Sequence, residues 1–196
     1  MLIRKKILGT ESDLKRAEAL FDAGEFDAAR QLLAPLIEKN NGAAIRLDCS
    51  YSDWEMTEQE SELRYVKGII RAAECGDLEA LYIVGFFYDM GDYDAIPMDK
   101  LKASQIFQEA ADKGHAHSMW IHATELLWGK GSYPQSIEEG HKYLDMAIEA
   151  ESGEACITKA RLLFNGELGL AKDPARAEEL RILAKKFDDT VYDPFD

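Results

Sequence analysis

The amino-acid sequence predicts an all-α protein built from about five antiparallel helix pairs, and two observations support this class. The first is composition: the 196 residues include 25 Ala and 21 Leu but only 3 Val and 5 Thr, a balance that favours helix over sheet. The second is internal repetition, because the small residues Ala80, Ser118 and Ala155 recur 38 and 37 positions apart. With 46% hydrophobic residues, the chain can bury a core of its own.

The second half of each unit repeats as well. Ala103, Gly140 and Ala177 are separated by 37 and 37 positions, and apolar residues follow each of them. Small residues at fixed positions allow two helix backbones to approach closely, so each unit is expected to form two packed helices. The pairs are predicted over residues 11–39, 41–75, 77–113, 115–150 and 152–187, within a single repeat domain of residues 11–187.

The first two pairs are the least regular. In the pair 11–39, Gly24 breaks the helix, and Pro35 is expected to kink or shorten the second helix. The pair 41–75 is a weaker copy, although Thr57-Glu-Gln-Glu60 matches a capping box and predicts where its second helix begins.

The last three pairs have matching start and stop signals. Their first helices are expected to end at a glycine, which tolerates the left-handed conformation of a helix end: Gly91, Gly129 and Gly166. Their second helices are expected to begin at caps: Asp99, the capping box Ser136-Ile-Glu-Glu139, and Asp173 followed by Pro174. Residues 188–196 are acidic and aromatic, and predict a tail or a cap on the final pair.

This unit of 36–38 residues resembles the Sel-one-like repeat (SLR), a relative of the tetratricopeptide repeat, over about 140 residues. The matching positions are Ala80, Gly85, Tyr88, Gly91, Asp99, Lys102, Ala103 and Ala110–Ala111; then Ser118, Ala123, Leu126 and Gly129, with Gly140 in place of the second-helix alanine; then Ala155, Ala160, Leu163, Gly166, Asp173, Arg176 and Ala177. The first pair resembles a tetratricopeptide unit instead, and the pair 41–75 lacks the Gly-x-x-Tyr ending. The resemblance implies a right-handed α/α superhelical solenoid that holds other proteins, and its signature contains no catalytic residue.

Charge limits the class of partner. With 23 Lys+Arg against 37 Asp+Glu, the formal net charge is −14, which repels nucleic acid and anionic membrane surfaces. Neither a secretory signal nor an apolar run long enough to cross a bilayer is recognised, and a cytoplasmic location is expected. The cysteines Cys49, Cys75 and Cys156 form no C-x-x-C pair and are expected to be free, buried thiols.

No motif predicts catalysis, a metal or a cofactor. His115 and His122 are seven residues apart on one helix face, but His117 points elsewhere, so these histidines are interpreted as solvated or capping residues rather than metal ligands. A hydrolase that used Glu79 and Asp89 would have its two carboxylates on backbone positions about 15 Å apart, too far for paired acid–base work. An enzyme is therefore not expected.

The repeat register predicts which residues face the concave side, which the first helix of every pair lines. The candidate partner-binding residues are Glu79, Tyr82, Phe86, Asp89, His117, Trp120, Thr124, Trp128, Glu154, Arg161 and Phe164, and the register also places Met90, Leu127, Ile157 and Asn165 there. The aromatic members of this set, Tyr82, Phe86, Trp120, Trp128 and Phe164, form a stripe at helical spacing. Such a stripe usually lies in the hydrophobic core. Here the core positions are expected to hold Ile83 or Val84, Tyr88, Leu126 and Leu163, so a surface role for the stripe stays equally open.

Three functions fit these expectations. The first is a monomeric, non-catalytic module that binds a basic protein in its groove, and its narrower form is an immunity protein that neutralises a bacterial toxin or secreted effector. The second is a general adaptor, scaffold or regulatory subunit in a signalling or secretion pathway. The third is a self-assembling repeat protein, against which the charged ends of the chain argue.

Overall fold

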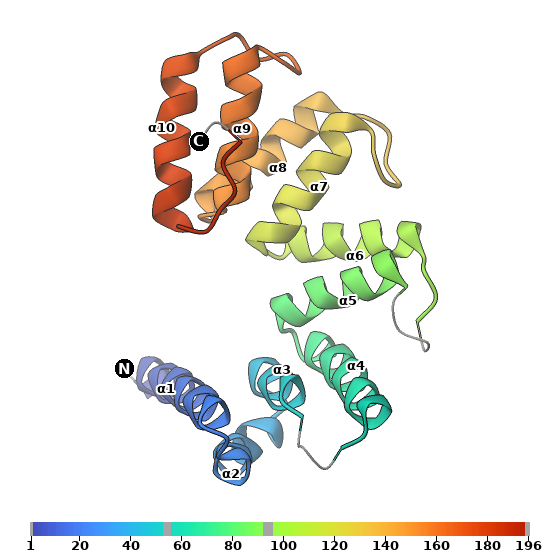
Figure 1. Cartoon of the computed structure of the whole chain (residues 1–196), viewed down its shortest axis with the longest axis vertical. Helices are drawn as coiled ribbons and strands as arrows, with labels where there is room; N and C mark the ends of the chain where they lie inside the picture. Colours follow the sequence, from blue (N-terminus) through green and yellow to red (C-terminus); the bar gives the residue numbers. More distant parts are fainter. Residues whose placement is uncertain (1, 53–55, 92–95, 195–196) are drawn as a thin grey trace. The chain divides into compact units, whose positions relative to one another are not determined.

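The computed structural model describes residues 2–52, 56–91 and 96–194, with side chains from residue 10 onward. Over these ranges the chain forms ten α-helices and no β-strand (Figure 1). The helices are α1 (Leu2–Asp22), α2 (Phe26–Ile37), α3 (Gly42–Ser50), α4 (Glu58–Glu74), α5 (Leu78–Met90), α6 (Lys100–Asp112), α7 (Ala116–Trp128), α8 (Ile137–Glu149), α9 (Gly153–Asn165) and α10 (Pro174–Phe187). The predicted all-α class is confirmed.

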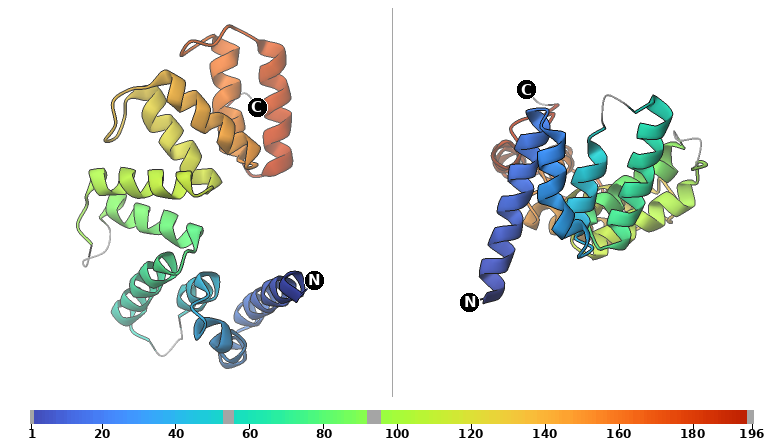
Figure 2. Two further views of the ribbon diagram at one scale, coloured as in Figure 1. Left: turned by 180° about the vertical axis from the view of Figure 1, so that it is seen from behind. Right: turned by 90° about the horizontal axis from the view of Figure 1, so that it is seen from below.

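Each predicted range contains two helices, and α1 begins well before residue 11. Helix α1 packs on α2, α3 on α4, α7 on α8 and α9 on α10 (Figures 1 and 2). The chain divides within α5 into two compact units, one ending at Val84 and the other beginning at Gly85.

The repeated small residues lie where helices meet. Ala44, Ala80, Ser118 and Ala155 are all fully buried. Gly140 is buried as well, and a methyl group there would come within 2.7 Å of Leu127 Cγ. The expectation that these positions are small because helices approach closely is confirmed.

The same small residues bond the caps of their helices, a regularity that was not predicted above although it is local in sequence. In four first helices, the side chain three positions earlier accepts a hydrogen bond from the backbone N–H of the small residue. The bonds are Ala44 N to Asn41 Oδ1 at 2.9 Å, Ala80 N to Asp77 Oδ1 at 2.7 Å, Ser118 N to His115 Nδ1 at 3.2 Å, and Ala155 N to Ser152 Oγ at 3.2 Å. Each cap satisfies one of the N–H groups that a helix start leaves unpaired.

The caps of the second helices follow the sequence with one exception. Thr57 forms the predicted capping box, and Asp99 and Asp173 accept hydrogen bonds from the backbone at the N-termini of α6 and α10. Ser136 precedes α8 but its side chain makes no cap hydrogen bond, so the predicted capping box there is wrong. Gly129 ends α7 in the left-handed conformation, as predicted.

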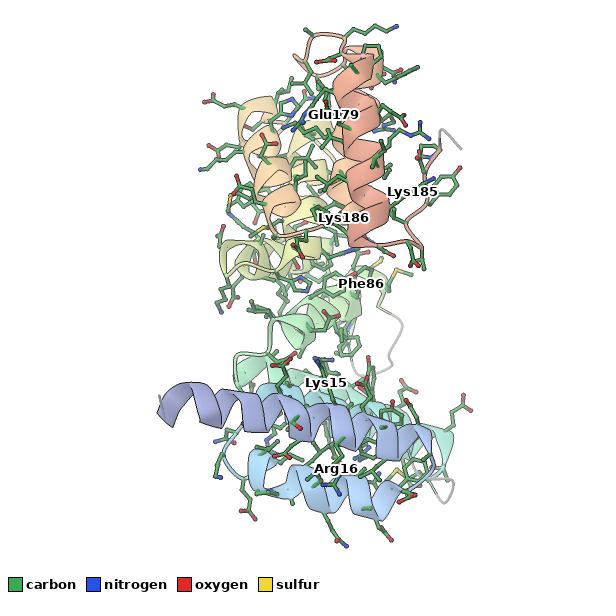
Figure 3. The ribbon with its side chains drawn as sticks, turned by 90° about the vertical axis from the view of Figure 1, so that its left-hand side faces the viewer. Lys15, Arg16, Phe86, Glu179, Lys185 and Lys186 are labelled. Atoms are coloured by element: carbon green, nitrogen blue, oxygen red, sulfur yellow. The ribbon has the colours of Figure 1, made fainter. Side chains whose placement is uncertain are left out.

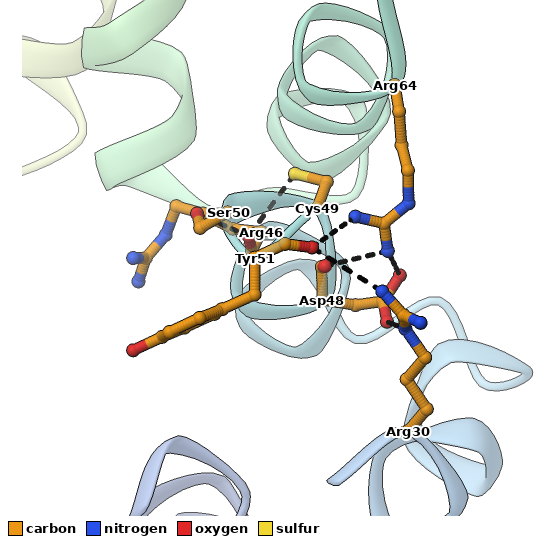
Figure 4. A network of polar contacts seen from close by, with 7 residues as sticks. All are labelled: Arg30, Arg46, Asp48, Cys49, Ser50, Tyr51 and Arg64. Carbon is orange, nitrogen blue, oxygen red and sulfur yellow. Dashed lines mark hydrogen bonds and ion pairs between the residues drawn. The ribbon is translucent and has the colours of Figure 1, made fainter. Parts of the chain in front are cut away.

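Helix α3 ends four residues short of the pattern set by α5, α7 and α9, which contain 13 residues each against its 9. No glycine closes it. Instead, the Arg64 guanidinium on α4 donates to the Asp48 carbonyl at 2.8 Å and to the Tyr51 carbonyl at 2.6 Å (Figure 4). The same guanidinium bonds the Asp48 carboxylate at 2.6 Å, and Arg30 on α2 pairs with that carboxylate at 3.4 Å. One ionic network therefore closes α3 and joins three helices.

The C-terminal end of α10 carries positive charge. Lys185 and Lys186 lie in the last turn of α10, where positive charge offsets the helix dipole (Figure 3). Among the residues that the structure describes, no helix combines the length and the apolar character that crossing a bilayer requires.

Candidate functional site

The second unit contains an open groove with a volume of about 400 Å³. Residues of α7 and α9 and of the segment after α10 line this groove. The lining residues are Trp120, Thr124, Trp128, Glu154, Ile157, Thr158, Arg161, Val191, Tyr192 and Pro194. Most of these side chains are apolar or aromatic, which is typical of binding sites.

The segment after α10 is fixed in place. Arg181 Nε on α10 donates to Asp193 Oδ2 at 2.7 Å, and only 1% of the Asp193 side chain is exposed. Val191 packs against the buried cluster between α9 and α10. Because inward Val191 and Asp193 flank it, Tyr192 points outward and is 82% exposed. This segment was expected only to be an acidic tail or cap, although the alternation Val-Tyr-Asp in an extended stretch indicates one inward face.

The two tryptophans of α7 are held by α9. Trp120 Nε1 donates to Thr158 Oγ1 at 2.8 Å, and the Arg161 guanidinium lies 5.1 Å from the centre of the Trp128 ring. Both rings are only partly buried. The hydrogen bond and the cation–π contact orient the rings while leaving part of each ring accessible from the groove.

A second hollow, of about 320 Å³, adjoins the groove and is more polar. It shares Thr124, Trp128 and Arg161 with the groove and adds Glu125 and Lys130. The Glu125 carboxylate accepts a hydrogen bond from Ser104 Oγ at 2.5 Å and lies 3.6 Å from His122 Nδ1. These contacts place its charge toward the interior of the unit.

The structure gathers only part of the predicted partner-binding set. Trp120, Thr124, Trp128, Glu154 and Arg161 line the groove together. The remaining residues of the second unit lie outside that lining, namely Phe86, Asp89, His117 and Phe164, while Glu79 and Tyr82 belong to the first unit.

Those outlying side chains have identifiable neighbours. His117 Nδ1 lies 3.0 Å from Glu154 Oε1, and its ring meets Trp120 edge-on, so it borders the groove without lining it. Asp89 pairs with Lys100 at 2.8 Å. Phe86 packs edge-on against the ring of Phe107.

Two expectations about helix faces are wrong. Leu127 was expected on the groove side but is fully buried, where it fills the space beside Gly140. Tyr88 was expected in the core, but Phe87 is buried there instead, and the Tyr88 hydroxyl accepts a hydrogen bond from Lys102 Nζ at 2.6 Å. Both errors arise in helices that are apolar around much of their circumference, where hydrophobicity does not mark one inner face.

The histidines have separate environments. His115 caps α7, which agrees with a capping role. His122 is 2% exposed and lies between the rings of Tyr133 and Tyr143, so the expectation of a solvated or capping residue is wrong for it. Among the described residues, no cluster of three or more His, Cys, Asp or Glu side chains has an arrangement suited to a metal ion.

Two of the three free cysteines are buried as predicted, namely Cys49 and Cys156, whereas Cys75 is partly exposed. Burial raises the pKa of each buried thiol from its ordinary value of 9.0 to about 11. As pH rises from 9 to 11, these thiols lose their protons in the unfolded chain before they do so in the folded protein. The free energy of unfolding should therefore fall over this range.

We expect iodoacetamide at pH 8.5 to modify Cys75 in the folded protein, and to modify Cys49 and Cys156 only after denaturation, since thiolates react and buried thiols stay protonated. Mass spectrometry of digested protein measures each site. The Cys75→Ser variant serves as the control and should show no rapid native modification. Equal rates for Cys49 in native and denatured protein would contradict the expectation.

Several solved structures resemble the chain. The Sel1 repeat protein from Oxalobacter formigenes aligns with a TM-score of 0.58 at 18% identity, over 86% of this chain and 82% of its own. A protective antigen of uropathogenic Escherichia coli that displays an SLR fold aligns with a TM-score of 0.62 at 14% identity, over 86% of this chain and 36% of the antigen. The chain has the Sel1-like repeat fold.

A third similar structure is the cysteine-rich protein B of Helicobacter pylori, with a TM-score of 0.50 at 19% identity, over 67% of this chain and 92% of its own. No protein-family model matches the sequence, and no curated protein matches it as a relative. The SLR fold is therefore recognised through the backbone and the repeated small residues. The groove residues are not part of that repeated pattern.

Proposed function

We propose that the protein is a non-catalytic binding module that holds a protein partner in the groove between α7, α9 and the segment after α10. The single observation that carries this proposal is the set of accessible rings around one hollow: Trp120, Trp128 and the largely exposed Tyr192. Large aromatic side chains at the centre of an interface supply much of its binding energy, because they bury area at little cost in conformational entropy.

The partner is proposed to be a basic protein. A formal charge of −14 attracts positively charged proteins over distances up to the Debye length, about 10 Å at 0.1 M salt, and accelerates their association. The fold supports this function by analogy only, since SLR proteins are built as repeats with extended surfaces.

Affinity capture from the native host, followed by titration of each captured protein, tests the proposal. Trp128→Ala should weaken binding about tenfold, because it removes a groove ring and the surface that supports Arg161. Raising salt from 50 to 300 mM should weaken it further. The matched control is Ile182→Ala, which removes an exposed apolar side chain on α10 outside the groove and should leave affinity unchanged. Equal loss in both variants, in proteins with unchanged melting temperatures, would refute a groove site.

A narrower form of the proposal is an immunity protein that neutralises a toxin or effector. The acidic charge favours it, since a basic toxin would be both attracted and occluded. Co-expression with the product of the neighbouring gene distinguishes this role from an adaptor, scaffold or regulatory subunit. Growth rescue that Trp128→Ala abolishes is the expected result, and a neighbouring product that is harmless alone would exclude the immunity role.

A further inference from the structure

Arg161 lies where the apolar groove and the polar hollow meet, because it lines both. Its guanidinium lies over the ring of Trp128, 5.1 Å from the ring centre, and this cation–π contact leaves its N–H groups able to donate to a ligand. No carboxylate in the described part of the chain forms an ion pair with Arg161 or with Lys130 in the same polar hollow. The junction therefore presents positive charge.

The carboxylates of the two hollows contact groups other than Arg161. Glu154 bonds His117 at 3.0 Å and accepts from Ser152 Oγ at 3.0 Å. Glu125 Oε1 accepts a hydrogen bond from Ser104 Oγ, whereas Oε2 is buried and has no hydrogen-bond partner among the described residues. Neither carboxylate forms an ion pair with Arg161, so its guanidinium can pair with an anion although the whole chain carries −14.

On the other side of Arg161 the groove is apolar. Trp120, Ile157, Val191 and Tyr192 line it with Pro194, and they form a hollow suited to a large apolar side chain. A ligand that fills the groove and satisfies Arg161 must therefore carry an apolar group and an anionic group next to each other.

We propose that the groove binds an extended internal segment of the partner in which a large apolar side chain lies beside an aspartate or glutamate, whose carboxylate pairs with Arg161. This inference rests on the proposed function, since it describes what enters the same groove. An internal segment fits better than a chain end, because hollows continue on both sides of Arg161 and a terminal carboxylate bound there would leave one of them empty. The negative charge of the whole protein attracts a basic partner before contact, whereas Arg161 pairs with one carboxylate of that partner in the bound complex.

Blocked peptides test the inference without the partner. The probes are acetyl-Ala-Leu-Phe-Glu-Ala-amide and the same peptide with Gln in place of Glu, titrated into ¹⁵N-labelled protein while the indole N–H signals of Trp120 and Trp128 are followed. The Glu peptide should bind about fivefold more tightly than the Gln peptide, because the bond to guanidinium is charge-assisted. Arg161→Gln should remove this difference while the Gln peptide keeps its affinity.

The matched control is Arg176→Gln, which removes an exposed arginine of α10 that pairs with Glu179 away from the groove and should preserve the fivefold difference. Equal affinities of the two peptides for the unmodified protein would overturn the inference while leaving the groove site intact. Tighter binding of a peptide that ends in a free carboxylate after Phe would overturn the choice of an internal segment. No indole shift with any peptide would overturn the inference together with the groove site of the proposed function.

Discussion

Gly68→Ala is expected to lower the free energy of unfolding of the first unit by about 3 kcal/mol, at the upper end of the usual cost of overpacking. Helices α3 and α4 cross at this glycine, and a Cβ atom added to it would lie 2.3 Å from Cys49 Cβ and 2.6 Å from Cys49 Sγ. Both Cβ atoms are fixed by their backbones, so the clash cannot be relieved by a change of rotamer. The two helices would have to separate. Urea unfolding followed by circular dichroism, with amide exchange in α3 and α4, measures the loss.

Two further variants separate this clash from an ordinary helix substitution. Lys67→Ala changes the exposed neighbouring residue of α4 and should alter stability by at most about 0.5 kcal/mol. Cys49→Gly removes the opposing Cβ, so adding Gly68→Ala to it should cost nothing and even favour helix. A full 3 kcal/mol loss in the Cys49→Gly background would show that the crossing is not the cause.

The sequence predicts this fold well wherever one helix pair repeats another. The 37-residue spacing of small residues located the helix contacts, because the closeness of two backbones depends on residues at those positions alone. The helix ends at Gly129 and Gly166 could also be predicted, since the left-handed conformation at a helix end strongly favours glycine.

Contacts between residues far apart in the sequence could not be predicted. Helix α3 does not end at a glycine, because arginines from α2 and α4 donate hydrogen bonds to the carbonyl groups at its C-terminal end. Nothing in the sequence of residues 41–52 indicates that these arginines lie nearby. The capping role of Asn41 and Asp77 was visible in principle as a polar residue three positions before each repeated small residue.

Only part of the candidate site could be predicted from the sequence. Trp120, Trp128 and Arg161 were found because the register of the repeat gives the face of each first helix. Tyr192 was missed, since the segment after α10 follows no repeat and is positioned by the pair of Arg181 with Asp193. Leu127 was misplaced by one helix face, which shows that periodicity is weak evidence in a helix with apolar residues on several sides.

Asp48→Ala is expected to lower the free energy of unfolding of the first unit by about 2 kcal/mol. The Asp48 carboxylate holds Arg64 at 2.6 Å and Arg30 at 3.4 Å, and these three side chains are only 22–27% exposed. Removing the carboxylate leaves two partly buried guanidinium groups facing each other, which repel and lose a charged partner. The arginines that bond the carbonyls at the end of α3 would then separate, so the loss includes part of the helix closure. Urea unfolding and exchange of the α3 amides measure it.

The comparison that isolates burial is Glu109→Ala, which removes an i,i+4 pair with Lys113 in which both side chains are more than half exposed. Such pairs contribute about 0.3–0.5 kcal/mol, so this variant should lose far less stability. Asp48→Asn keeps the size and one acceptor oxygen and should fall between the two. If Asp48→Ala lowers the free energy of unfolding no more than Glu109→Ala does, then the hydrogen bonds to the carbonyl groups are enough to hold the arginines. In that case the Asp48 carboxylate contributes nothing to the end of α3.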